Sequence, residues 1–502
     1  MRVAIIHYHL RRGGVTRVLE FCVPSLAAAG HEVVILTGEP PVDGSALAGY
    51  SVIVPELAYD SNLEPGDGSA LMSIVSEAAL DSLGGHPDIW HVHNHHLGKN
   101  FHVTAMVGAL ARRGDHLLLQ IHDFPEDGRP VNYSCQRFVA ENSGADLSGY
   151  LYPQNGRGSI HYAVLNSRDE QVLEASGLRD THLHSLPNPV PGHQDSSCDR
   201  RKSESTVRNE IGCGDNSRFL LYPSRSIRRK NIGEIILWGL ISSRMGHPYH
   251  IGLTLKPENP DALEIYTGWR DWVEEVDMPV HFEMGLDSRW SFRDLLAACD
   301  GFISTSVAEG FGLPFLEPWI LGKGIVGRDI PDITIDFKNA GMDFGRGLYE
   351  SIQVPFDWLN QRGLDFRRDF ATALDQTITA YGLDLTGAQI RDAADRRLAS
   401  GYADFASLSE RQMSAVVSMI RSDSDMIDTL VPHSLPDLQG NDQIQKNAQV
   451  VAGHYSVERY VRRLTGIYET ILTRQDSDAG IIDAQKVLME YLDPDRFLFL
   501  CS

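Results

Sequence analysis

The stretch "GFISTSVAEGFGLPFLEPW", residues 301–319, combines a short β-rich run with a glycine-rich turn. A helix is predicted to begin near Leu313, since a proline stands in its first turn. Glu309 lies in the turn and Glu317 follows after seven intervening residues, about one turn into that helix. Free backbone N–H groups at a helix start suit a phosphate or a sugar hydroxyl. The stretch therefore predicts a strand–turn–helix unit with a ligand site at the carboxyl end of the strand.

The same alternation of short apolar runs and helical lengths extends over most of the chain. Strands are predicted in the first half at "RVAIIHY", "EVVILTG", "SVIVPEL", "DIWHVH", "HLLLQIH" and "IHYAVLN", and in the second at "RFLLYPS", "PYHIGLTL", "VHFEMG" and "GFISTS". Helical stretches fall between several of them, which is typical of parallel sheets covered by helices. We predict an α/β protein of two Rossmann-like domains that face each other across a cleft, because ligands of such sheets lie outside the carboxyl ends of the strands.

Composition shifts divide the chain. The polar stretch 188–206 has two prolines and no periodicity, so we assign residues 1–190 to an N-terminal Rossmann-like domain and 191–216 to a linker. Residues 217–450 are assigned to a C-terminal Rossmann-like domain with a helical insertion at about 360–450. Residues 451–502 are predicted to form C-terminal helices.

The overall charge limits the partners. A formal net charge of -22 and a pI near 5.3 disfavour nucleic acid and anionic membrane surfaces, which both reward clustered Lys and Arg. No run approaches ~18 apolar residues, so no integral membrane contact is expected. The first residues lack the pattern of a signal peptide and the six cysteines are scattered, so we expect a cytoplasmic protein with reduced thiols.

The run Glu-Gly-Phe-Gly-Leu-Pro, followed by a second Glu, resembles glycosyltransferase family four, the retaining nucleotide-sugar glycosyltransferases of the GT-B fold. The resemblance extends along most of the chain. It implies that residues 1–190 form the acceptor-side domain and residues 217–450 the nucleotide-sugar-binding domain, and that the C-terminal helices of residues 451–502 return to the first domain. It implies that Glu309 holds the donor sugar and that Glu317 accepts both ribose hydroxyls. It further implies that the donor is bound by the intervening residues Gly310, Phe311, Gly312 and Leu313.

Other matches to the family supply the remaining site residues. In "LYPSRSIRRKN" the resemblance places Arg225 and Lys230 on the donor diphosphate, although Arg228 and Arg229 leave the register of the lysine open. Fixed cations can stabilise the negative charge that grows on the leaving phosphate, so a divalent metal or another cofactor is not expected to be essential. His122, which ends the strand "LLLQIH", is expected at the donor sugar.

The loop "HYHLRRGGVTRV" is predicted to serve both substrates. Gly13 and Gly14 let backbone approach a ligand closely, and in the family this loop lies near the donor. Arg11, Arg12 and Arg17 cluster around it, and the planar guanidinium suits carboxylate or phosphate. We therefore predict that they bind an anionic acceptor. The alternative is that they are solvated or serve only the donor phosphates.

The histidines of "DIWHVHNHHLG" invite a second hypothesis, a zinc site. Strand alternation would put three of His91, His93, His95 and His96 on one face. No Cys or carboxylate completes the set, and relatives carry a similar pattern as scaffold. We therefore favour a structural role and predict no metal.

Together these features predict a retaining hexosyltransferase. It would move glucose or mannose from a nucleoside diphosphate sugar, such as UDP-glucose or GDP-mannose, to a hydroxyl of a small acceptor. That acceptor would be an anion such as a glycerate or phospho-sugar derivative. The alternatives are a nucleotide-sugar-binding protein without transferase activity and a GT-B sugar-nucleotide epimerase.

Overall fold

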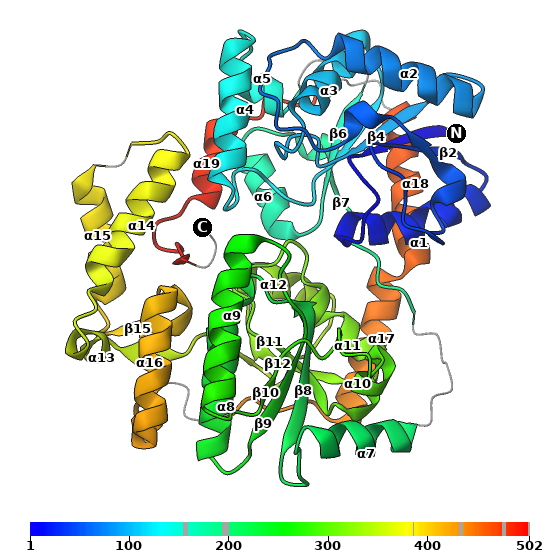
Figure 1. The fold of residues 1–502 in the computed structure, drawn as a ribbon. Coiled ribbons are helices and arrows are strands. Elements are labelled where there is room, and N and C mark those ends of the chain that lie inside the picture. Colours follow the sequence, from blue (N-terminus) through cyan, green and yellow to red (C-terminus); the bar gives the residue numbers. More distant parts are fainter. Residues whose placement is uncertain (154–158, 193–199, 385, 431–434, 474–477, 500–502) are drawn as a thin grey trace. The chain divides into compact units, whose positions relative to one another are not determined.

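A computed structural model describes residues 1–153, 159–192, 200–384, 386–430, 435–473 and 478–499 (Figure 1). The chain forms two compact units, each described here by itself. The first comprises Met1–Pro191, Thr379–Leu383 and Ala452–Asp493. The second comprises Gly192–Ile378, Asp384–Val451 and Pro494–Ser502. Cys198 and Cys501 lie outside the described residues.

A seven-stranded parallel sheet forms the centre of the first unit. Its strand order is β3-β2-β1-β4-β5-β6-β7, and all six predicted strands are present. The strand β7 was not predicted, because three residues give too short an apolar pattern. The strands are β1 Arg2–His7, β2 Glu32–Thr37, β3 Ser51–Ile53, β4 Ile89–His93, β5 Leu117–Gln120, β6 Ile160–Val164 and β7 Leu183–Ser185.

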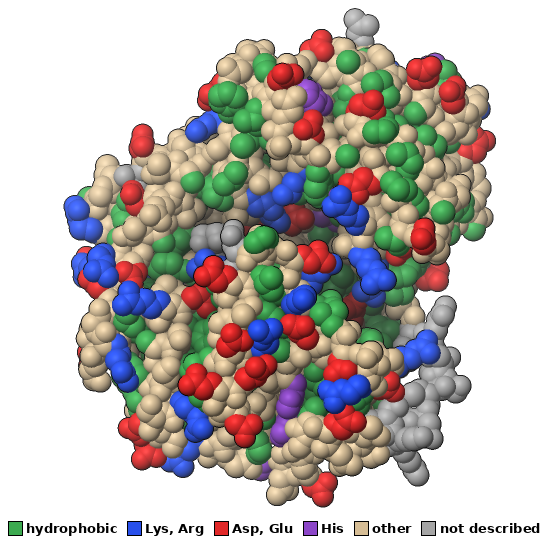
Figure 2. All heavy atoms as spheres, in the orientation of Figure 1, with side chains coloured by type: hydrophobic (Ala, Val, Ile, Leu, Met, Phe, Trp, Pro, Cys, Tyr) green, Lys and Arg blue, Asp and Glu red, His purple; other side chains and the backbone are tan. Residues whose placement is uncertain are grey.

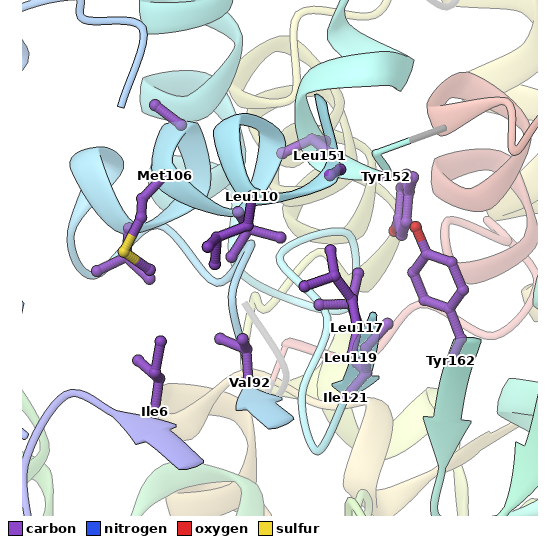
Figure 3. Packing of buried hydrophobic residues seen from close by; sticks show 14 of the residues in the cluster. Ile6, Val92, Met106, Leu110, Leu117, Leu119, Ile121, Leu151, Tyr152 and Tyr162 are labelled. Carbon is purple, nitrogen blue, oxygen red and sulfur yellow. The ribbon is translucent and has the colours of Figure 1, made fainter. Parts of the chain in front are cut away.

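Helices cover both faces of this sheet, so successive residues of its strands alternate between two cores. Ile6 packs with α3 residues such as Met106 and Leu110 in one core (Figure 3), whereas Ile5 packs with α1 and α18 residues in the other. Burial of both faces explains the continuous apolar runs of the sequence. The helices are α1 Gly14–Ala28, α2 Ser69–Leu83, α3 Phe101–Arg113, α4 Pro130–Asn142, α5 Leu147–Leu151, α6 Ser167–Ala175, α18 Val457–Thr473 and α19 Ala484–Tyr491.

The second unit repeats this architecture with six parallel strands in the order β10-β9-β8-β11-β12-β13. The polar stretch predicted as the linker includes the helix α7, whose Arg208 is ion-paired with Asp300. The strands are β8 Arg218–Arg225, β9 Tyr249–Leu255, β10 Val280–His281, β11 Gly301–Ser304, β12 Gly324–Arg328 and β13 Leu348–Tyr349. The helices are α7 Arg200–Glu210, α8 Ile232–Arg244, α9 Pro260–Glu275, α10 Phe292–Ala298, α11 Glu317–Ile320 and α12 Pro331–Asn339.

The region predicted as a helical insertion is joined to the second sheet by a buried ionic network. Arg328 bonds Glu234 at 2.6 and 3.0 Å and Asp404 at 2.8 Å, and the Tyr349 hydroxyl donates to Glu234 at 2.7 Å. Because every charge has a partner, the network offsets the cost of burial and fixes the insertion. The elements of this region are β14 Gln353–Pro355, α13 Phe356–Gln361, α14 Phe366–Ala380, α15 Gly387–Leu398, β15 Tyr402–Asp404, α16 Glu410–Ser422 and α17 Asn441–Tyr455.

The surface mixes charges of both signs. Figure 2 shows Lys and Arg side chains interspersed with Asp and Glu side chains over the elements of the second unit. Among the described residues, no helix has both the length and the apolar character needed to cross a membrane.

Candidate active site

The glycine-rich turn after β11 is tightly constrained. Gly312 has a φ of 92°, and a Cβ atom there would lie 2.5 Å from Cγ2 of Ile333. Only glycine fits this position. Phe311 is buried and its ring meets that of Phe337 edge-on at 5.9 Å. The predicted donor residue Phe311 thus has a packing role in the turn.

The prediction of one continuous helix after this turn is wrong. Leu313–Phe315 forms a single 3-10 turn, and the α-helix α11 begins only at Glu317. The reason is Pro318, which has no N–H to donate to the carbonyl of Pro314. Glu317 is therefore the first residue of a four-residue helix, rather than lying one turn into a longer one.

Glu309 belongs to a compact group of charges. Its carboxylate forms an ion pair with the Lys230 ammonium and a second one, at 3.2 Å, with the Arg229 guanidinium. The side chains of Lys230 and Glu309 are only 6% and 7% exposed. Burial alone would raise the pKa of Glu309, but the two cations outweigh it and hold the pKa below its ordinary value. The carboxylate is thus ionised and shared between Lys230 and Arg229.

Polar residues at the end of β11 hold this group in place. The Thr305 hydroxyl donates to the carbonyl oxygens of Lys230 at 2.8 Å and of Asn231 at 3.1 Å. The Ser306 hydroxyl lies 3.0 Å from that of Tyr222 on β8. The "STS" triplet before the glycine-rich turn therefore ties β11 to the loop that carries Lys230. The sequence analysis missed these hydroxyls, although their position directly after a buried strand was a usable signal.

Arg225 stands apart from this group. It ends β8, is 42% exposed and pairs with the still more exposed Glu258 at 2.8 Å. Exposed pairs of this kind are weak, because water and salt screen them. Of the cations in "SRSIRRKN", the structure thus brings Lys230 and Arg229 to Glu309, and it leaves the Arg225 guanidinium open to exchange its partner.

In the first unit, the loop between β1 and α1 leaves its glycines open. Gly13 caps α1 with extended backbone and no side-chain hydrogen bond, and a Cβ atom on Gly14 would meet nothing within 4 Å. The first turn of α1 has no acidic residue. The start of this 15-residue helix thus presents backbone N–H groups beside empty space.

The three arginines of this loop differ from one another. Arg11 forms a bidentate ion pair with Glu39, its Nε lying 2.6 Å from Oε2. Arg12 is exposed and forms no ion pair with any described residue. The Arg17 guanidinium lies over the Phe21 ring, 5.8 Å from its centre. The carboxylate of Glu39 thus already occupies the planar fork of Arg11.

His122 lies in a stack of buried, neutral imidazoles at the carboxyl edge of β1, β4 and β5. Its Nε2 is 2.9 Å from Nδ1 of His93, and the His93 ring also stacks on His91 and meets His7 edge-on. Burial lowers the pKa of His7 and of His91 to about 3, and that of His122 to about 4. These rings therefore act as neutral donors and acceptors near pH 7.

Asn94 positions this loop and was missed by the sequence analysis. It has a φ of 52°, and its side-chain oxygen accepts from the peptide N–H of His122 at 2.7 Å and of Asp123 at 3.2 Å. Its carbonyl accepts from the Tyr8 hydroxyl at 2.8 Å. Asparagine tolerates left-handed backbone, so an Asn directly after a strand was the available signal.

The same residue keeps the four histidines from coming together as the zinc hypothesis requires. The strand ends at His93 and Asn94 turns the chain, so His95 stacks on His96 instead of joining His91 and His93. Among the described residues, no group of three or more His, Cys, Asp or Glu side chains could hold a metal ion.

A curated protein with a similar sequence is mannosylglucosyl-3-phosphoglycerate synthase of Petrotoga mobilis. It is 30% identical over 355 residues, which are 67% of this chain and 66% of the relative. The chain thus spans slightly less than two thirds of the relative's length. No protein-family model matches the chain.

Solved structures show the fold. Anabaena HepE, crystallised with UDP and glucose, superposes with a TM-score of 0.54 at 10% identity and covers 93% of this chain and 99% of its own. The catalytic domain of Arabidopsis thaliana starch synthase IV also gives a TM-score of 0.54, at 12% identity, with 94% and 99% covered. The two sheets have the GT-B architecture of these proteins. By fold, the chain is thus similar to the GT-B glycosyltransferases.

Proposed function

We propose that this protein is a retaining glycosyltransferase that moves a hexose, glucose or mannose, from a nucleoside diphosphate sugar to a hydroxyl of a phosphoglycerate-type acceptor. The observation that carries the proposal is the ion-paired group of Glu309, Lys230 and Arg229 at the carboxyl edge of the second sheet, in which Glu309 and Lys230 are buried. The name of the Petrotoga relative supports an acceptor that carries phosphoglycerate.

The charges of the second unit suit a diphosphate leaving group. As the bond from the anomeric carbon to the phosphate oxygen breaks, negative charge grows on the β-phosphate, and Lys230 can stabilise it together with Arg225 or Arg229. Glu309 would accept hydrogen bonds from sugar hydroxyls, and Glu317 from the two ribose hydroxyls. No metal ion is required for this role of the cations.

The acceptor hydroxyl would attack the anomeric carbon from the face that the diphosphate leaves. One carbon–oxygen bond breaks, another forms on the same side, and the hydroxyl proton passes to the departing phosphate oxygen. His122 is neutral, so it would orient a sugar hydroxyl by hydrogen bonding rather than supply charge. The anomeric configuration is thereby retained.

The experiment is an assay of nucleoside diphosphate release from UDP-glucose and GDP-mannose, with and without 3-phosphoglycerate or its glucosylated derivative. We expect release that depends on the acceptor and matches the amount of glycoside formed, with unchanged rates after chelation of divalent metals. Binding of the nucleotide without release would favour a sugar-nucleotide-binding protein. Conversion of the donor alone would favour an epimerase.

A further inference from the structure

Lys99, in the loop that follows β4, is a half-buried cation that forms no ion pair with a described residue. Its ammonium lies over the Tyr59 ring, 5.8 Å from the centre, and its carbonyl accepts from the peptide N–H of Asp60 at 2.9 Å. Within the described part of the chain, no carboxylate lies within ion-pair distance of Lys99. A cation in this position has lost part of its hydration without gaining a charged partner.

Arg129 brings a second positive charge to this place. Its Nη2 pairs with Asp123 at 2.7 Å, and its Nη1 donates to the carbonyls of Phe124 at 3.2 Å and Asp127 at 3.1 Å. These contacts use three of the five guanidinium N–H donors. The remaining donors, on Nε and Nη2, make no hydrogen bond to any described residue. The guanidinium is thus held rigidly with donors to spare.

The peptide of Arg129 is fixed as well. Tyr381, from the segment Thr379–Leu383, is buried, and its hydroxyl accepts from the Arg129 N–H at 2.8 Å. The same hydroxyl donates to the carbonyl of Glu126 at 2.9 Å. These two hydrogen bonds therefore restrain the backbone of residues 126–129 near Lys99.

The electrostatics of the place show an uncompensated positive charge. Burial lowers the pKa of Lys99, the nearby Arg129 lowers it further, and Asp123 opposes both. Arg11 and Glu39 also act on the Tyr59 ring, but they neutralise each other in their own ion pair. Arg129 and Asp123 also neutralise each other in an ion pair. The positive charge of Lys99 is therefore in excess at this place, although the chain as a whole has a net charge of -22.

We propose that Lys99 and the free donors of Arg129 bind the phosphate group of the acceptor. This inference rests on the proposed function, whose acceptor class it assigns to particular residues. A phosphate oxygen would take the place of the missing counter-ion of Lys99, while the rigid guanidinium donates to a second oxygen. Tyr59, 46% exposed with His9 against its ring at 4.7 Å, would flank the carbon skeleton.

This assignment differs from the arginines of the β1–α1 loop that the sequence pointed to. Arg11 is committed to Glu39, whereas Lys99 is a single lysine without neighbouring basic residues in the sequence. Only the fold brings Lys99 close to Arg129, which lies 30 positions later in the chain: the Asn132 side-chain amide, in the first turn of α4, donates to the carbonyl of Leu97 in the loop of Lys99 at 2.8 Å.

The test compares Lys99→Gln and Arg129→Gln with the matched control Lys486→Gln, which removes a charge from an exposed lysine of α19 in the same unit. We expect the KM of a phosphorylated acceptor to rise by about 10- to 100-fold in the first two variants. The affinity for the nucleoside diphosphate and the control's KM stay unchanged, and Lys99→Arg restores most of the loss. An unchanged KM in a folded Lys99→Gln protein would overturn the assignment.

A second arm separates this inference from the proposed function. Binding of inorganic phosphate and of 3-phosphoglycerate is measured by calorimetry without any donor. Binding that Lys99→Gln weakens supports the site even if no phosphorylated acceptor is turned over, a result that would contradict only the proposed function. Equal binding by the wild type and Lys99→Gln, or no binding at all, contradicts the site.

Discussion

In the second unit, the ions at the carboxyl edge of the sheet contact one another: the buried carboxylate of Glu309 is ion-paired with both Lys230 and Arg229, which leaves one positive charge in excess. In the first unit, neutral imidazoles surround His122, and Lys99 has no counter-ion among the described residues. At the proposed donor edge both cations are thus paired with one carboxylate, whereas at the proposed acceptor edge Lys99 forms no ion pair with a described residue. This difference indicates that ion pairs hold the cations of the proposed donor edge in place before a ligand binds. At the proposed acceptor edge, Lys99 would gain its counter-ion from the bound acceptor.

The largest effect is expected from a substitution in the ion-paired group of Lys230, Arg229 and Glu309. Lys230→Gln removes the buried cation that is proposed to stabilise the negative charge of the transition state, so turnover should fall about 100-fold or more. Arg218→Gln, at the other end of β8, is the matched control and should retain its rate. Arg225→Gln should also slow turnover. Near-normal turnover in a folded Lys230→Gln protein would refute the role of this group.

The proposed contacts of Glu317 with the ribose hydroxyls can be tested separately from the charges on the diphosphate. Glu317→Gln keeps the shape of the side chain but weakens its charge-assisted hydrogen bonds, so donor affinity should fall by about 1.5 to 3 kcal/mol for each bond lost. A nucleotide without both ribose hydroxyls should bind weakly to the wild type and be almost indifferent to the mutation. Equal losses for both nucleotides in titration calorimetry would show that Glu317 acts elsewhere.

The pH dependence of stability should show that the buried carboxyl group of Glu126 is neutral in the folded protein. Burial raises the pKa of Glu126 to about 8, although the Tyr152 hydroxyl donates to it at 3.0 Å. The folded protein thus keeps a proton that the unfolded chain loses above its ordinary pKa of 4.5. Between these values, the free energy of unfolding should fall by about 1.4 kcal/mol for each pH unit of rise.

Glu126→Gln cannot ionise, so its melting temperature relative to the wild type should increase as the pH rises from about 5 to 8. Thermal unfolding at several pH values checks this result. A difference that stays constant over that range would mean that Glu126 is ionised in the native protein.

A moderate effect is expected from substitution of Tyr381, whose hydroxyl bonds the Arg129 N–H and the Glu126 carbonyl. Tyr381→Phe removes one hydroxyl and leaves the Arg129 N–H and the Glu126 carbonyl without it. Stability should fall by about 1 to 3 kcal/mol. A purely structural role would lower stability alone, whereas positioning of Arg129 predicts an additional rise in acceptor KM at constant nucleotide affinity.

The smallest effect is expected at Arg11. Glu39 already neutralises it in an exposed pair, so Arg11→Gln should change the acceptor KM less than Lys99→Gln does. Arg12→Gln tests the remaining free guanidinium of that loop. If either variant raised the acceptor KM more than Lys99→Gln, the acceptor anion would bind at the glycine loop instead.

Sequence patterns predicted the sheets because buried parallel strands leave continuous apolar runs, as in "RVAIIHY" and "RFLLYPS". They also pointed to Glu309 and Lys230, since a glycine turn and a basic loop each follow a strand. They did not show that Arg229 shares Glu309, because a 3-10 turn at Arg228–Lys230 decides which side chains reach inward. The broken helix at Glu317 was foreseeable from Pro318.

The proposed acceptor site could not be predicted from the sequence, because its contacts join distant segments. Lys99, Arg129 and Tyr381 lie on three separate stretches of sequence and share no motif. Tyr381 reaches the first unit only because the chain returns there for the five residues Thr379–Leu383. Such a return is a product of tertiary packing, which local periodicity does not encode.

The most direct test of the account is a product analysis with wild-type protein, a nucleoside diphosphate hexose and a phosphoglycerate-type acceptor. The account predicts a glycoside that carries the phosphate, formed in equal amount to the nucleoside diphosphate released, with the anomeric configuration of the donor retained in the nuclear magnetic resonance spectrum. It also predicts that Lys230→Gln abolishes most of this product. Tight nucleotide binding without any transferred sugar, or a product of inverted configuration, would contradict it.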